Sequence, residues 1–130
     1  MINGIHHVAI ICSDYETSKS FYTQTLGLRI LAENPQPLRD SIKLDLKLAD
    51  NTQIELFCFK NAPKRPSYPE AQGLRHLALA TDNLDDLKAD LESKNIEVQD
   101  IRIDEYTGNR FMFIHDPDGL PIEFYETKSL

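Results

Sequence analysis

Two histidines and two glutamates stand at matching places in the two halves of this 130-residue chain. His7 precedes Glu55 by 48 residues, and His76 precedes Glu123 by 47. Imidazole nitrogens and carboxylate oxygens bind divalent cations such as Zn, Ni, Co, Mn or Fe, and four such ligands leave positions open for water or substrate. Without a cation, two carboxylates close together in a cleft repel and raise each other's pKa. The residue types therefore favour a metal site.

The four residues belong to an internal repeat, which is the strongest feature of the sequence. Residues 4–13 and 73–82 carry a glycine, a histidine and an alanine at equivalent positions. Residues 50–57 and 118–125 form a second matching pair, each with an Ile-Glu dipeptide followed by leucine or phenylalanine. Either half alone is marginal in size for a stable domain. We therefore expect two modules that pair within the chain, between chains, or both.

Composition limits the classes of partner. The net charge of −7 predicts no nucleic-acid or anionic-membrane surface, because such surfaces need clustered Lys and Arg. The longest apolar run, residues 8–12, is too short to cross a bilayer, and the N-terminus lacks the pattern of a signal peptide. A cytoplasmic protein is expected. Cys12 and Cys58 lie in apolar strand-like runs and are interpreted as buried thiols.

The first module is predicted to run strand, helix, strand, strand, strand. A capping-box pattern at residues 13–16 predicts a helix that begins at Ser13 and closes at Gly27, where glycine tolerates the left-handed conformation. The two prolines of residues 34–37 predict a loop. The strands are expected at residues 5–12, 28–32, 42–48 and 53–59.

The second module is predicted to repeat this order after a proline-rich linker. Asp82 is expected to cap a helix whose apolar face carries Leu84, Leu87 and Leu91. Residues 116–119 predict a turn. The strands are expected at residues 74–81, 96–103, 111–114 and 121–125. One domain over residues 1–130 is thus expected, with module 1 at about 4–60, the linker at 61–72 and module 2 at about 73–127.

Alternation along the strands predicts where the four polar residues point. In the first strand of each module the histidine shares a face with alanine, while bulkier apolar residues point the opposite way. In the last strand Glu55 and Glu123 likewise point away from their apolar neighbours. Two such modules facing each other would bring two imidazoles and two carboxylates together. His6 falls on the other face and His115 flanks a turn, so neither is interpreted as a ligand.

Taken together, the motifs resemble the vicinal oxygen chelate superfamily, to which glyoxalase I, the bleomycin-resistance proteins and the extradiol dioxygenases belong. The segments that carry the resemblance are residues 6–10, 21–22, 26–28, 73–78 and 116–125. The resemblance implies an α+β fold of two paired βαβββ modules that form a curved, cleft-forming mixed sheet. It also implies one divalent ion, Zn, Ni or Co before Mn or Fe, held by His7, Glu55, His76 and Glu123.

The activity implied by the resemblance is that of a glyoxalase-I-like lyase in a homodimer. Such an enzyme isomerises a hemithioacetal of methylglyoxal and a thiol to a thioester through a metal-stabilised enediolate, with Glu123 as the expected base and Glu55 as the alternative. Rival activities in the superfamily are those of an extradiol dioxygenase, an epimerase, a thiol transferase and a non-catalytic binding or resistance protein. The first strand lacks the arginine that glutathione-dependent members often use for a substrate carboxylate. The cations that could replace it are Lys64, Arg65, Arg75, Arg102 and Arg110.

Overall fold

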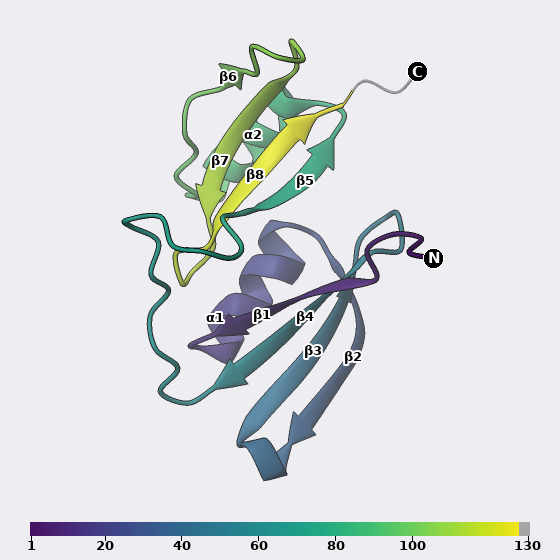
Figure 1. The fold of residues 1–130 in the computed structure, drawn as a ribbon, viewed down its shortest axis with the longest axis vertical. Coiled ribbons are helices and arrows are strands. Elements are labelled where there is room, and N and C mark those ends of the chain that lie inside the picture. The colour runs from purple at the N-terminus through teal and green to yellow at the C-terminus, as the bar shows by residue number, and fades with distance from the viewer. Residues whose placement is uncertain (128–130) are drawn as a thin grey trace. The chain divides into compact units, whose positions relative to one another are not determined.

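The computed structural model describes residues 1–127 and divides into two compact units. The first unit comprises Met1–Lys64, and the second begins at Arg65. The division falls inside the predicted linker. Each unit contains one α-helix and one four-stranded sheet, and each is described here by itself (Figure 1).

The first unit has the predicted order strand, helix, strand, strand, strand. Its sheet has the strand order β1-β4-β3-β2, with β1 parallel to β4 and the other neighbours antiparallel (Figure 1). The elements are β1 (His7–Cys12), α1 (Tyr15–Ser20), a π-helical turn (Phe21–Thr25), β2 (Arg29–Gln36), a 3₁₀ turn (Pro37–Arg39), β3 (Ser41–Lys47) and β4 (Gln53–Phe59).

The helix of the first unit begins one residue later than predicted. Asp14, not Ser13, is the N-cap, and its carboxylate accepts hydrogen bonds from the backbone N–H and the hydroxyl of Thr17. Donation from Thr17 holds the pKa of Asp14 below its usual range. The helix then widens into the π-helical turn before Gly27, whose φ of +76° confirms the predicted left-handed end.

The predicted loop at residues 34–37 was wrong. β2 continues to Gln36, and Pro35 pairs with Ile42 of β3. β2 is the edge strand of this sheet. Proline removes one backbone donor, and an edge strand tolerates that loss because one of its sides has no neighbouring strand to accept it. The proline therefore marks an edge and not a break.

The second unit repeats the βαβββ order and the pairing scheme. Its sheet has the order β5-β8-β7-β6, again with the first and last strands parallel. The elements are β5 (Leu77–Thr81), α2 (Leu84–Ser93), β6 (Arg102–Ile103), β7 (Arg110–His115) and β8 (Pro121–Glu126). No helix within residues 1–127 is long and apolar enough to cross a membrane.

Three predicted boundaries in this unit were wrong. β5 begins at Leu77, so His76 immediately precedes the strand. Asn83, not Asp82, caps α2, because the Asn83 side chain accepts from the backbone N–H of Asp86. The strand predicted at residues 96–103 shrinks to two residues, since only Arg102 and Ile103 pair with β7. Polar alternation alone overestimated its length.

The turn before β8 is built around Asp116. Its buried carboxylate accepts hydrogen bonds from the backbone N–H groups of Asp118 and Leu120, each at 2.9 Å. Gly119 takes the left-handed conformation with φ +86°, as hairpin turns require. The predicted turn is confirmed, and it fixes the point at which β8 starts.

Leu91 anchors α2, and its replacement should destabilise the second unit. Leu84 and Leu91 are fully buried and Leu87 is half-buried, so the predicted apolar face of the helix is confirmed. Leu91→Ala leaves a cavity, so we expect a loss of about 2–5 kcal/mol in unfolding free energy, measured by urea denaturation. The control is Glu92→Ala on the exposed side of the same helix, which removes only the Lys88 ion pair and should cost at most about 0.5 kcal/mol. Equal effects of the two changes would contradict the packing role.

Asp104 links stability of the second unit to pH. Its carboxylate accepts from the backbone N–H of Tyr106 and from the hydroxyl of Tyr125, and these bonds lower the pKa of Asp104 below its ordinary value of 3.8. A lowered folded-state pKa stabilises the fold above the unfolded-state pKa, and that stability is lost as pH falls through the lower value. Asp104→Asn should therefore make the unfolding free energy depend less steeply on pH in acid, by the equivalent of at most about one bound proton. Urea titrations between neutral and strongly acidic pH test this, and an unchanged slope would contradict it.

Candidate metal-binding pairs and an adjoining cavity

In the first unit the sheet brings His7 and Glu55 to one face. Because β1 and β4 are parallel neighbours, Ala9 lies opposite Glu55 in the register. His7 is two residues before Ala9 and so shares its face. The small alanine side chain leaves room for the imidazole above the carboxylate, and Nε2 of His7 lies 3.6 Å from Oε1 of Glu55.

The second unit repeats this geometry. Ala78 lies opposite Glu123 in the parallel register of β5 and β8, and His76 is two residues before Ala78. Nε2 of His76 lies 3.8 Å from Oε2 of Glu123. The predicted alternation is confirmed in both units, since Ile10, Ile54, Ile122 and Phe124 are buried on the opposite faces.

Both pairs have the chemistry and the spacing of metal ligands. The two Nε2-to-oxygen distances exceed that of a hydrogen bond. Such separations are expected for a nitrogen and an oxygen that both bind the same cation at about 2.0–2.2 Å. The carboxylate side chains are largely covered, with exposed fractions of 14% for Glu55 and 15% for Glu123. Neither accepts a hydrogen bond from any residue that the structure describes, so both carboxylates keep oxygen lone pairs available to a cation.

Each unit by itself contributes a pair and not a complete site. Within residues 1–127 no three His, Cys, Asp or Glu side chains group together in a way that could hold a metal ion. The histidine and glutamate of each unit are thus two of the four ligands that the sequence predicts. The four-ligand set stays a prediction.

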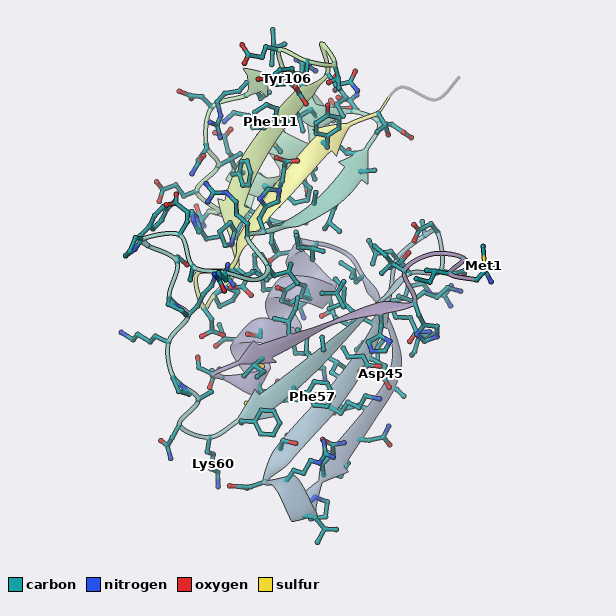
Figure 2. All side chains as sticks on the ribbon, viewed as in Figure 1. Met1, Asp45, Phe57, Lys60, Tyr106 and Phe111 are labelled. Atoms are coloured by element: carbon teal, nitrogen blue, oxygen red, sulfur yellow. The ribbon has the colours of Figure 1, made fainter. Side chains whose placement is uncertain are left out.

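The surroundings of the two glutamates differ. In the first unit Asp45 of β3 is the register partner of Glu55, and Lys43 Nζ lies 3.6 Å from Glu55 Oε2 and 3.4 Å from Asp45 Oδ1. Asp45 and Phe57 lie on this sheet (Figure 2). In the second unit the register partner of Glu123 is the uncharged Phe113. Glu55 therefore has a lysine as an ion-pair partner, which it shares with Asp45, whereas no Lys or Arg pairs with Glu123 among the described residues.

Neighbouring rings orient both histidines. Nδ1 of His6 lies 2.9 Å from Nδ1 of His7, so one ring donates and the other accepts. This contact uses Nδ1 of His7 and leaves Nε2 facing Glu55. In the second unit the His76 ring meets Phe113 edge to face at 5.1 Å between centroids. His6 lies just before β1, and its ring contacts that of His7. Alternation from residue 5 had predicted that the two side chains lie on opposite faces, so this contact was not expected.

A cavity of about 790 Å³ adjoins the pair of the second unit. Its wall consists of most of the segment 65–76, which includes His76, together with side chains of β6 and β7. Phe111 and Phe113 supply apolar surface, and Phe111 lies on β7 (Figure 2). His115, predicted not to be a ligand, lies on the same wall and is exposed. The cavity gives the second unit room for a small molecule beside a candidate ligand.

The contacts of Lys43 and Phe113 were not predicted from the sequence. The alternation of Lys43, Asp45 and Lys47 with leucines did contain a signal, because it places these charges on the Glu55 face of the sheet. The prediction of buried thiols is confirmed in part: neither cysteine forms a disulfide within residues 1–127, but only Cys12 is buried, and Cys58 is half-buried.

Comparison with known proteins gives one consistent result. Residues 4–124 match the model of the Glyoxalase/Bleomycin resistance protein/Dioxygenase superfamily. The uncharacterized protein YaeR of Escherichia coli (strain K12) is 52% identical over 125 residues, which cover 96% of this chain and 97% of that protein.

Solved structures agree. The crystal structure of the glyoxalase family protein from Enterococcus faecalis is 46% identical, has a TM-score of 0.89, and covers 95% of this chain and 97% of that one. A glyoxalase I mutant from Zea mays is 20% identical with a TM-score of 0.81 over 96% of this chain and 46% of that one, which is a likeness of fold.

Proposed function

Since the chain belongs to the glyoxalase/bleomycin resistance protein/dioxygenase superfamily, we propose that it is a metal-dependent lyase of the glyoxalase I type. Its substrate would be the hemithioacetal of an α-oxoaldehyde and a thiol, and its product the isomeric thioester. The observation that carries the proposal is the matching pair in each unit, His7 with Glu55 and His76 with Glu123.

These four side chains would hold the ion, and Zn, Ni or Co is expected before Mn or Fe. When bound, a divalent cation would polarise the neighbouring hydroxyl and carbonyl oxygens, which makes the C–H proton on the carbon that bears the hydroxyl and the sulfur more acidic. The proposal is the same whether the two pairs come from one chain or from two copies in a homodimer.

Proton transfer is the step that the protein itself would perform. A carboxylate takes the proton from the carbon that bears sulfur and returns it to the adjacent carbon, while the hydroxyl proton moves between the two oxygens. The reaction is an isomerisation and consumes no oxidant or reductant. We assign the transfer to Glu123. Lys43 forms an ion pair with Glu55, and a nearby positive charge makes a carboxylate a weaker proton acceptor.

The test combines metal content with an assay. Protein purified without a tag or chelator is analysed for metal, reconstituted separately with Ni, Co, Zn, Mn or Fe(II), and assayed for thioester formation from methylglyoxal with glutathione or N-acetylcysteamine. About one metal ion per set of four ligands together with thioester formation would support the proposal. Metal without thioester from either thiol, or no metal under any reconstitution, would contradict it. The control is the double variant His7→Ala/His76→Ala.

A further inference from the structure

His6 lies directly before β1, and the sheet holds its backbone beside His7. The carbonyl of His6 accepts a hydrogen bond from the N–H of Gln53 at 3.0 Å, and Gln53 is the register partner of His7 in β4. The two imidazole rings meet edge to face, with 5.1 Å between their centroids and 86° between their planes. Their Nδ1 atoms are 2.9 Å apart. The contact between the rings therefore starts from a fixed backbone.

The side chain of His6 has no packing role in the first unit. It is exposed, so its removal uncovers little apolar surface. Apart from its contact with the His7 ring, it makes no hydrogen bond or ion pair with any residue in the range 1–127. A side chain whose directed contact is with a candidate metal ligand is placed to act on that ligand.

The position of one proton decides the direction of this hydrogen bond. Two neutral imidazoles can share a bond between their Nδ1 atoms only if one ring carries its proton there and the other does not. Nε2 of His7 faces Oε1 of Glu55 at 3.6 Å, and a neutral ring that binds a cation through Nε2 carries its proton on Nδ1. His7 is then the donor, and Nδ1 of His6 is the acceptor. Histidine ligands almost always donate their second N–H to an outer partner of this kind.

The second unit lacks this arrangement. The residue before His76 is Arg75, which pairs with Glu70 at 3.3 Å. No hydrogen bond joins Nδ1 of His76 to any other residue of the described range 1–127, and its ring meets Phe113 edge to face instead. The internal repeat therefore does not account for His6. The first unit orients its histidine by a hydrogen bond, and the second orients its histidine by packing.

We infer that His6 is a positioning residue, whose Nδ1 accepts a hydrogen bond from Nδ1–H of His7 and so holds His7 in the tautomer that presents the Nε2 lone pair to a cation. The inference rests on the proposed function, because that function makes His7 a ligand. It adds to the four ligands a fifth side chain that does not touch the ion. The tautomer is already set in the metal-free chain.

The first test determines the tautomer of His7 without metal. The full chain is labelled with ¹⁵N-histidine and freed of metal with a chelator that is then removed. Two-bond ¹H–¹⁵N spectra in mildly alkaline buffer, where neutral imidazole predominates, show which ring nitrogen carries the proton. We expect the proton of His7 on Nδ1 in the wild type and a shift toward Nε2 in His6→Ala. His6→Asn should restore the Nδ1–H tautomer, because Oδ1 of asparagine, like Nδ1 of histidine, is an acceptor bonded to Cγ.

The second test measures metal affinity, with Zn or Co alone in competition with a chromogenic chelator. Loss of an outer partner of a histidine ligand typically weakens metal binding by about 10-fold to 100-fold, which is the loss expected for His6→Ala. His6→Asn should lie within about 3-fold of the wild type, since it keeps the acceptor. The matched control is Arg75→Ala, which changes the residue before the other candidate histidine. It should also stay within about 3-fold, because Arg75 pairs with Glu70 and does not contact His76.

Four results would each overturn the inference. They are a His7 proton on Nε2 in the metal-free wild type, an unchanged tautomer in His6→Ala, an affinity of His6→Ala equal to that of the wild type, and equal losses of affinity in His6→Ala and His6→Asn. A wild-type chain that binds no metal would contradict the proposed function. The NMR measurement would still decide whether His6 sets the tautomer of His7, so the two failures can be told apart.

Discussion

Replacing His76 with alanine should abolish stoichiometric metal binding and, with it, thioester formation. The variant removes an imidazole whose Nε2 lies 3.8 Å from the Glu123 carboxylate, and with it one of the two candidate ligands of the second unit. Loss of one ligand should weaken metal affinity by more than about 100-fold, because loss of a supporting outer partner already costs up to that much. Metal analysis after gel filtration, with circular dichroism to check the fold, is the measurement.

His115→Ala is the matched control for this variant. His115 is an exposed histidine on the wall of the same cavity, outside the predicted ligand set. It should keep full metal content. Unchanged metal content in His76→Ala, or an equal loss in both variants, would refute the ligand assignment.

The same two histidines can show whether the pairs come from one chain or two. If two chains share a site, refolding a mixture of His7→Ala and His76→Ala proteins should restore one intact set of ligands per mixed dimer. If each chain forms its own site, the mixture should recover no metal binding. Recovery of metal binding would also support the homodimer that the family resemblance implies.

Replacing Glu123 with glutamine should lower turnover by about 100-fold to 10,000-fold, the range expected for loss of a positioned base. The amide keeps an oxygen that can bind a cation but cannot accept a proton from carbon. Metal content should therefore fall less than turnover. The measurement is kcat for thioester formation in variants reconstituted to the same metal content.

Glu55→Gln is the matched control for the base assignment. Glu55 also lies beside a histidine, His7, but Lys43 lies 3.6 Å from its carboxylate. We expect Glu55→Gln to retain at least about 10-fold more activity than Glu123→Gln, within the range that a proton-transfer group contributes. The opposite order would assign the base to Glu55.

Much of the fold could be predicted because the signals are periodic and repeated. β4 spans the predicted residues 53–59, and Leu84 and Leu91 are buried as the helical spacing requires. The pairing of each histidine with its glutamate follows from alternation once the first and last strands of a module lie side by side.

The predictions were wrong where the local sequence is compatible with two structures. Ser13 and Asp14 can both cap a helix, and the choice depends on which side chain reaches Thr17. Pro35 breaks a central strand but not an edge strand, and position in the sheet is not a local property. The stacking of Arg102 on Phe111 and Phe113 could not be predicted from sequence, because it depends on which strand lies beside β6.

The parallel pairing of first and last strands has a consequence for the order of folding. Antiparallel neighbours such as β3 and β4 can meet through a short turn, but β1 meets β4 only after the rest of the unit has been made. Contacts of such high sequence separation close late, because loop entropy opposes them. During synthesis the His7–Glu55 pair can therefore assemble only after β4 has left the ribosome, and the His76–Glu123 pair only after β8 has left it. The nascent chain therefore presents neither pair of candidate ligands until the unit that carries it is complete.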